Sequence, residues 1–277
     1  MSFRKFLSTA AMCSVSLSAF AQVKLEAVPI NFKFTEKGFI GEKTYKLEAF
    51  EYTPATLNSK VIVMSHGSTG GKPDAIKASI QYRAIATEAT RNGYVFVVYM
   101  RKGRGNSEGD FTEESGKCDF GSLRREQAEA EAQLTQVIEQ VKAKHSVQKV
   151  VLMGHSRGGY LSATYAAKRP ESVQAVVNLA GVWSAACEGK NGGQSRRDLE
   201  ESAVKFAPQF WAYFEGDTYF MGDKFNDPEY QWFSKTVASH VNFQKFEQDG
   251  MPDGHATPIF KPKVWAASFF PALNNIK

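Results

Sequence analysis

Short, continuous apolar runs alternate with longer amphipathic stretches through most of this chain. Buried strands are predicted at residues 60–65, 94–100, 149–153, 173–179, 209–214 and 241–247. Helices are predicted at residues 80–91, 122–144, 157–169, 228–239 and 264–272. Because an uninterrupted apolar strand is covered on both faces, this alternation predicts an α/β fold: a mostly parallel, doubly wound sheet with helices on both faces.

Two regions depart from this alternation. Residues 30–34 and 43–52 alternate polar and apolar side chains, which predicts an opening antiparallel hairpin. Residues 184–206 are rich in glycine and paired charges, which favours a small lid insertion over the active site, with a plain surface loop as the alternative. No Pro-rich linker or repeat divides the sequence, so residues 22–277 are predicted to form a single domain.

The first residues have the features of a secretory signal peptide. Arg4 and Lys5 precede a moderately apolar stretch, and Ala19-Phe20-Ala21 matches an A-x-A cleavage site. The stretch is too short to span a membrane. We therefore expect a signal peptide at residues 1–21 and a soluble, exported protein, periplasmic or secreted, with no stable membrane insertion after cleavage.

Cys118 and Cys187 are the two cysteines that remain after this leader is removed. In an oxidising compartment an isolated pair favours a disulfide over two free thiols. The sequence has no C-x-x-C and no histidine pair at ligand spacing, so no metal site is predicted.

The formal net charge of +5 is mild and spread along the chain. The densest basic spots, residues 101–104 and 261–263, are short and have no aromatic residues between the charges. We therefore expect solvated surface at both places and no nucleic-acid partner.

Residues 154–158 read Gly-His-Ser-Arg-Gly and lie between a predicted strand and a predicted helix. A G-x-S-x-G pattern in that context predicts a nucleophile elbow, with Ser156 as the nucleophile. A second match, at residues 105–109, follows a polar spacer and has no helical periodicity after it. Its serine, Ser107, is therefore expected in a mobile polar loop and not at a catalytic centre.

A nucleophilic serine needs an adjacent base, which a carboxylate must orient. Among the five histidines, His255 lies in a Gly- and Pro-rich loop after the last predicted strand, whereas the others lie at strand or helix ends or inside the elbow. Active-site loops gather at the carboxyl edge of a parallel sheet. His255 is therefore the predicted base.

The acid must come between Ser156 and His255 in chain order. Asp217 is the candidate nearest the end of the predicted strand 209–214, where its position is rigid, and Asp223 and Asp227 are the competing candidates. The oxyanion would need backbone N–H donors. The amide of Arg157 and the amide of Ser68, in the Gly-rich segment 65–71, are the predicted pair.

Several segments together resemble the dienelactone-hydrolase-like branch of the α/β-hydrolase superfamily. They are His66-Gly67-Ser68, residues 104–109, residues 154–159, residues 210–217 and Gly254-His255. The resemblance covers the chain from about Val61 onward and implies an eight-stranded-type sheet, no cofactor, ester hydrolysis through an acyl-enzyme, and a structural role for the loop of Ser107. Dienelactone hydrolases proper carry a cysteine nucleophile, and this chain has Ser156 there.

The predicted function is therefore that of a carboxylesterase with a serine nucleophile, acting on a small or medium ester. An amidase or peptidase with the same triad is one alternative, and a non-catalytic binding protein that retains the fold is another. The dense aromatic residues between positions 206 and 233 either line an acyl or aryl pocket or pack in the core.

Overall fold

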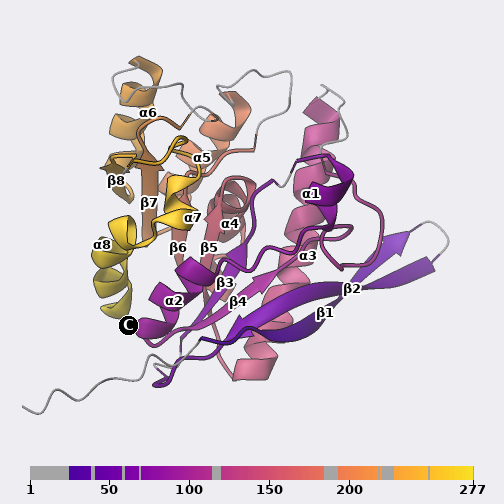
Figure 1. Ribbon diagram of the computed structural model, residues 1–277. Helices are drawn as coiled ribbons and strands as arrows, with labels where there is room; N and C mark the ends of the chain where they lie inside the picture. The colour runs from indigo at the N-terminus through magenta and orange to yellow at the C-terminus, as the bar shows by residue number, and fades with distance from the viewer. Residues whose placement is uncertain are drawn as a thin grey trace, which may run out of the picture.

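An eight-stranded sheet forms the centre of the computed structural model, in the order β1-β2-β4-β3-β5-β6-β7-β8 (Figure 1). The structure describes residues 25–38, 41–57, 60–68, 70–113, 120–183, 193–217, 219, 228–248 and 250–276. The strands are β1 (Val28–Gly38), β2 (Gly41–Tyr52), β3 (Val61–Ser65), β4 (Val95–Tyr99), β5 (Val150–His155), β6 (Val173–Leu179), β7 (Gln209–Phe214) and β8 (Asn242–Phe246). β1 and β2 are antiparallel to each other, β2 is antiparallel to β4, and β3 to β8 run parallel. The predicted hairpin and the mostly parallel sheet are both confirmed.

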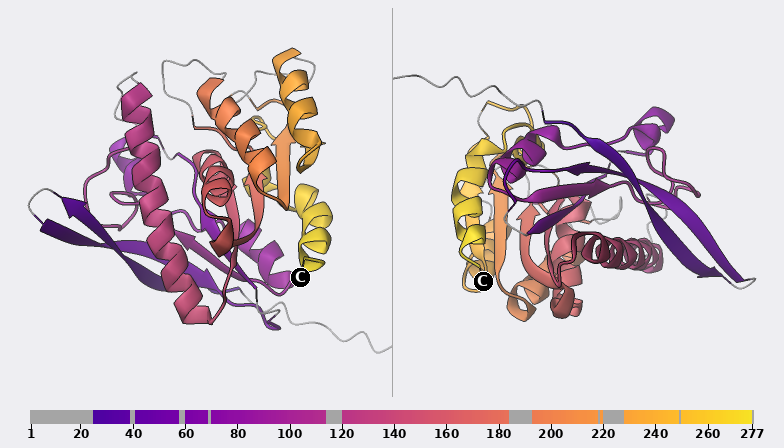
Figure 2. Two further views of the ribbon diagram at one scale, coloured as in Figure 1. Left: turned by 180° about the vertical axis from the view of Figure 1, so that it is seen from behind. Right: turned by 90° about the horizontal axis from the view of Figure 1, so that it is seen from below.

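Helices cover both faces of this sheet (Figures 1 and 2). They are α1 (Pro73–Lys77), α2 (Arg83–Arg91), α3 (Phe120–His145), α4 (Arg157–Lys168), α5 (Gly193–Lys205), α6 (Pro228–Ala238), α7 (Thr257–Phe260) and α8 (Lys263–Asn274), with a 3₁₀ turn at Pro170–Ser172. Buried residues of α3, α4, α5 and α6 join one core, and those of α2 and α8 join the other. The doubly wound arrangement is thereby confirmed.

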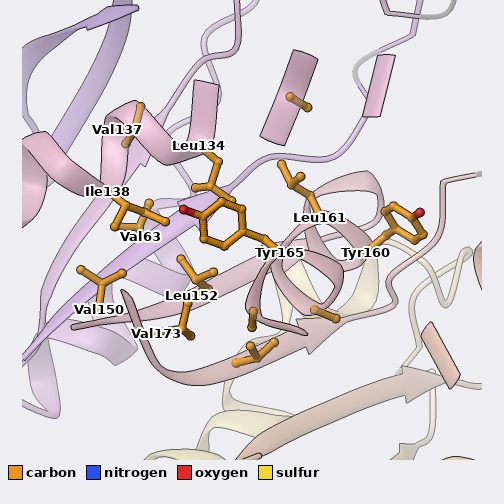
Figure 3. Packing of buried hydrophobic residues seen from close by; sticks show 14 of the residues in the cluster. Val63, Leu134, Val137, Ile138, Val150, Leu152, Tyr160, Leu161, Tyr165 and Val173 are labelled. Carbon is orange, nitrogen blue, oxygen red and sulfur yellow. The ribbon is translucent and has the colours of Figure 1, made fainter. Parts of the chain in front are cut away.

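The two cores divide the side chains of each central strand by alternation. Along β3, Val61 and Val63 belong to one core, and Ile62 and Met64 belong to the other. Successive side chains of a strand point to opposite faces, so a strand covered on both sides needs apolar residues at every position. Figure 3 shows the first core, where Val63 of β3 and residues of β5 pack against side chains of α3 and α4.

Part of the segment predicted as a lid or loop is a regular helix. Residues 193–205 form α5, which buries Leu199 and Ala203. Asp198 of α5 accepts a hydrogen bond from Tyr160 of α4 at 2.7 Å and pairs with Arg124 of α3. This part of the segment therefore belongs to the helical layer, because its apolar spacing and its charged partner fix it there. Residues 184–192 lie outside the described residues.

Most of the described aromatic residues between positions 206 and 233 pack in the core. The buried members are Phe206, Phe210, Trp211, Tyr213, Phe214 and Phe233. Tyr219 and Trp232 are instead 56% and 58% exposed. Phe220, Phe225 and the side chain of Tyr230 lie outside the described residues. For the buried members, the core interpretation is confirmed.

Several predictions from the sequence fall where the structure is not described. The expected signal peptide at residues 1–21 and both cysteines, Cys118 and Cys187, lie outside the described residues. Within the ranges given above, no helix combines the length and the apolar character that crossing a membrane requires.

Candidate active site

Ser156 occupies a tight turn between the end of β5 and the start of α4. Its backbone has φ 56° and ψ −123°, a conformation that a residue with a side chain rarely adopts. Hydrogen bonds hold the turn: Ser156 N donates to Leu179 O at 3.0 Å, and Ser156 O accepts from Val182 N and Tyr160 N, both at 3.1 Å. β6 and α4 thus hold the strained residue in place.

The glycines around Ser156 are required by close backbone contacts. A Cβ atom on Gly154 would overlap the carbonyl oxygen of Gly158, and a Cβ atom on Gly158 would overlap the carbonyl oxygen of Ser65. β3, β5 and α4 therefore approach one another more closely than any side chain would permit. This packing is the physical basis of the G-x-S-x-G spacing.

Asp217 and His255 are brought together at the carboxyl edge of the sheet. Asp217 follows β7, and its two carboxylate oxygens each lie 2.9 Å from Nδ1 of His255. A carboxylate accepts, so Nδ1 carries the proton and donates it, which leaves Nε2 as the basic nitrogen. Asp217 Oδ1 also accepts from the backbone N–H of Tyr219 at 3.0 Å. Asp223 and Asp227 lie outside the described residues.

The imidazole of His255 lies beside that of His155, the residue before Ser156, with 4.8 Å between the ring centroids. Nε2 of His255 is buried and makes no hydrogen bond within the described part of the chain, so none joins it to Ser156 Oγ there. In sites without substrate, catalytic hydrogen bonds are often long and tighten only when substrate binds. Nε2 is the atom that could accept a proton in this site.

The predicted oxyanion donors come from the residue after Ser156 and from the segment that follows β3. Arg157 is the first residue of α4, so its amide is one of the first N–H groups of the helix, for which the helix itself supplies no carbonyl partner. A Cβ atom on Gly67 would lie 2.9 Å from the Cβ of Ser156, and Ser68 is the next residue. Gly67 N is already engaged, since it donates to Tyr82 Oη at 3.1 Å.

The basic run at residues 101–104 is not solvated surface, and that expectation is wrong. Arg101 and Arg104 are both fully buried and both pair with Glu113. Arg101 Nη1 also donates to the carbonyl oxygen of His66 at 2.7 Å. Burial by itself would raise the pKa of Glu113, but Arg101 lowers it far below its usual value, so the carboxylate stays charged.

This buried ion cluster is hydrogen-bonded to the segment that carries Ser68 and holds it in place. His66 Nε2 accepts from the backbone N–H of Arg101 at 3.1 Å, and its Nδ1–H donates to Gly67 O at 2.7 Å. Burial lowers the pKa of His66 well below its usual range, which makes it a poor proton acceptor and a structural residue. Glu113 and Tyr82 were missed from the sequence because nothing in their local pattern points to their partners, Arg101 and Gly67, which only the fold brings close.

Ser107, in the second G-x-S-x-G match, is buried and hydrogen-bonded to two backbone groups. Its Oγ donates to Met100 O at 2.8 Å and accepts from Glu48 N at 2.9 Å. The expectation of a loose polar loop is wrong because this loop continues the pairing of β2 beyond the end of β4. The flanking glycines, Gly105 and Gly109, have φ of 56° and 90°, the left-handed region that favours glycine.

The described residues contain no group of three or more His, Cys, Asp or Glu side chains that could hold a metal ion. The candidate site within these residues consists of the buried pair Asp217–His255 and the strained Ser156, whose neighbour His155 contacts His255.

Comparison with known families identifies the fold. A family model described as the alpha/beta hydrolase fold matches residues 60–248. The chain belongs to that family. A comparison with curated proteins finds no match.

Several solved structures are similar to this chain in fold. The chain is similar to an esterase from Pyrococcus furiosus, Pf2001, at 14% identity and a TM-score of 0.61, covering 91% of this chain and 92% of that one. It is also similar to Est1E from Butyrivibrio proteoclasticus, solved with ferulic acid bound, at 17% identity and a TM-score of 0.54, over 83% and 93% of the two chains. A proline iminopeptidase from Mycobacterium smegmatis is similar at 14% identity and a TM-score of 0.56, over 88% and 97%.

Proposed function

We propose that this protein is an exported serine hydrolase, specifically a carboxylesterase that cleaves a small or medium ester through an acyl-enzyme. The observation that carries the proposal is the pairing of Asp217 with Nδ1 of His255 at 2.9 Å, with Nε2 left as a buried acceptor at the edge that carries the strained Ser156. A serine at an elbow, a carboxylate and an imidazole, in this chain order, are the parts of a nucleophilic triad.

In the proposed reaction Ser156 Oγ attacks the ester carbonyl carbon while His255 Nε2 takes its proton. Asp217 holds the ring and stabilises the imidazolium that forms. The amides of Arg157 and Ser68 would bind the oxyanion. His255 then returns the proton to the leaving alcohol, which leaves an acyl group on Ser156. Water attacks that acyl group with His255 again as the base, and the acid is released.

The choice of an ester substrate rests on the names of similar proteins and on the resemblance to the dienelactone-hydrolase-like branch, in its serine form. Pf2001 and Est1E support an ester, whereas the similarity to a proline iminopeptidase supports the amidase or peptidase alternative. Both reactions pass through the same tetrahedral intermediate, so only substrates can separate them.

The deciding experiment is labelling with a fluorophosphonate probe, which reacts with an activated serine. We expect wild-type protein to be labelled and Ser156→Ala to be unlabelled. Ser107→Ala is the matched control, since it removes the serine of the other G-x-S-x-G match, and it should be labelled like the wild type. An unlabelled wild type would instead support a binding protein that retains the fold.

The acid is tested by Asp217→Asn, with hydrolysis of p-nitrophenyl acetate as the readout. Loss of the charge that holds His255 should lower kcat by about 10³- to 10⁴-fold. Asp223→Asn and Asp227→Asn should leave kcat near the wild-type value. A large loss with either of them, and none with Asp217→Asn, would move the acid to the other residue.

Export is part of the proposal, together with removal of residues 1–21, one domain over residues 22–277 and a disulfide between Cys118 and Cys187. Mass analysis of the protein recovered from the periplasm or medium should give an N-terminus at Gln22. Non-reduced peptides should show the two cysteines linked. Two free thiols would end the disulfide proposal without affecting the proposed triad.

A further inference from the structure

His155 directly precedes Ser156, and the proposed mechanism gives its side chain no role. It is the last residue of β5 and is buried. Its Nε2 lies 2.7 Å from the backbone carbonyl oxygen of His255, and the two imidazole ring centroids are 4.8 Å apart. The elbow and the loop of the proposed base are therefore in direct contact.

The protonation state of His155 follows from its partner. A carbonyl oxygen can only accept, so Nε2 of His155 carries a proton and donates it. Its Nδ1 lies close to Gly67, since a Cβ atom on that glycine would be 3.0 Å from it. Burial, and to a smaller extent the neighbouring His255, lowers the pKa of His155 to about 3. Near neutral pH the ring is an uncharged donor with one defined tautomer.

His255 lies in the loop between β8 and α7, and this loop is bonded to the loop after β7, since Gly254 N donates to Gly216 O at 3.2 Å. The ring of His255 is held by Asp217, and its backbone N–H donates to Asp253 Oδ1 at 2.8 Å. Both partners lie on loops that follow β7 and β8. The bond from His155 ties the same residue to β5, the strand that leads into Ser156.

We propose that His155 is a positioning residue that sets the distance between the imidazole of His255 and the hydroxyl of Ser156. The inference rests on the proposed function of Ser156 and His255. Because His155 and Ser156 are consecutive, a movement of the elbow also moves the donor that holds His255. A misplacement of about 1 Å in a catalytic group can cost about 100-fold in rate. One hydrogen bond placed in this way therefore controls kcat.

Two substitutions of His155 distinguish the effect of losing the hydrogen bond from the effect of losing the ring volume. His155→Phe keeps a ring of similar size and removes the donor, whereas His155→Gln removes the ring and places an amide N–H at a similar reach. Both proteins are assayed with p-nitrophenyl acetate, and folding is checked by near-UV circular dichroism. We expect His155→Phe to lower kcat by about 10- to 100-fold with KM nearly unchanged. We expect His155→Gln to retain most of the wild-type kcat.

Each outcome of this comparison has one meaning. A folded His155→Phe protein with wild-type kcat overturns the inference, and so does a His155→Gln protein as slow as His155→Phe. If the wild type hydrolyses the ester and Ser156→Ala does not, these results concern His155 alone. If the wild type is neither active nor labelled at Ser156, the proposed function fails and the inference fails with it.

A spectroscopic measurement on the wild type covers the case in which His155→Phe does not fold. In long-range ¹H–¹⁵N spectra of histidine-labelled protein at pH 7, His155 should show a neutral ring with the proton on Nε2. A charged ring or a proton on Nδ1 would overturn the proposal, because neither state matches an uncharged ring that donates from Nε2 to His255 O. Assignment uses His155→Gln, whose spectrum should lack that signal.

Discussion

Two serines in this chain share one short motif, and their surroundings give them opposite tasks. Ser156 is held in a strained turn between a buried strand and a helix N-terminus. Ser107 uses both its donor and its acceptor capacity on the main chain of Met100 and Glu48. A hydroxyl bonded in this way has a structural role, because attack on a substrate carbonyl would require both hydrogen bonds to break.

Ser107→Ala should therefore destabilise the protein without changing its chemistry. The substitution leaves the buried carbonyl of Met100 and the N–H of Glu48 unsatisfied, which should cost about 1 to 3 kcal/mol of unfolding free energy. Urea denaturation measures this loss, and kcat for p-nitrophenyl acetate should stay at the wild-type value. Ser156→Ala is the matched comparison, with little change in stability and no turnover. A folded Ser107→Ala protein without activity would contradict the assignment.

At the scale of elements, the outer edge of the sheet is completed by side chains. β1 is the edge strand, and the β1–β2 ribbon extends away from the other strands (Figures 1 and 2). Gln140 of α3 bonds both backbone groups of Lys33, at 2.9 and 2.7 Å, and Gln136 bonds both groups of Thr35, each at 2.8 Å. Each amide takes the place of a neighbouring strand's peptide group.

The spacing of these two pairs follows from helix and strand geometry. Positions i and i+4 of a helix are about 6 Å apart along its axis, and positions i and i+2 of a strand are about 6.6 Å apart. Gln136 and Gln140 can therefore meet Thr35 and Lys33 at the same time. An edge strand with unpaired backbone groups is a template for pairing with another chain, so the glutamines protect β1 from that.

Replacing both residues, as Gln136→Leu with Gln140→Leu, should open the edge of β1. The side-chain volume stays similar, while the four hydrogen bonds from the two glutamines to β1 are lost. We therefore expect a loss of about 1 to 3 kcal/mol of unfolding free energy. We also expect dimers or larger species that grow with protein concentration. Size-exclusion chromatography over a dilution series measures the second effect.

The control for this double variant is Glu139→Leu. Glu139 lies on the same helix, has a side chain 59% exposed, and forms a surface ion pair with Lys142. The control adds an apolar residue without touching β1. If Glu139→Leu associates as strongly as the double variant, surface hydrophobicity and not the opened edge is the cause.

At the scale of the whole molecule, the parallel strands bring distant parts of the chain to one edge. Ser68, Ser156 and Asp217 each follow the carboxyl end of a strand, β3, β5 and β7 respectively, and His255 lies in the loop after β8. Loops at the carboxyl ends of parallel strands meet on the same side of the sheet. The eight-stranded fold therefore positions a site whose members are far apart in sequence.

Two neutral histidines buried within this fold should make it sensitive to mild acid. Burial lowers the pKa of His155 to about 3 and lowers that of His66 well below its usual range. In the unfolded chain both titrate near 6.5, so below that pH the unfolded state binds more protons than the folded state. Their contribution to stability is complete above about pH 6.5 and is lost as the pH falls toward the folded-state values.

Below pH 6.5 the unfolding free energy should fall by about 1.4 kcal/mol per pH unit for each of these histidines. For the two together the slope should be about 3 kcal/mol per pH unit. Urea denaturation between pH 7 and pH 5 measures the slope. His155→Gln should reduce it by about half. Glu113 also loses stabilising charge in acid, but its carboxyl titrates near 4.3 when unfolded, so its effect begins at lower pH. A flat profile between pH 7 and pH 5 would contradict the prediction.

The sequence by itself determined the alternation of strands and helices, the elbow at Ser156 and the order of Ser156, Asp217 and His255. These features are local: continuous burial is visible as a run of apolar residues, and a turn too tight for side chains is visible as glycine. The helix α5 also has a local pattern of apolar residues, Leu199 and Ala203, four residues apart. The glycines at its start led instead to the prediction of a lid or loop.

Only the tertiary structure decided which hydrogen-bond or ion-pair partner each buried polar group has. The burial of Arg101 depends on Glu113 and on the carbonyl of His66, and the edge of β1 depends on glutamines about a hundred residues away. The same holds for the bond between His155 and the carbonyl of His255. A buried polar group is stable only beside its partner. The partner's place in space depends on the packing of the whole sheet, which no short stretch of sequence encodes.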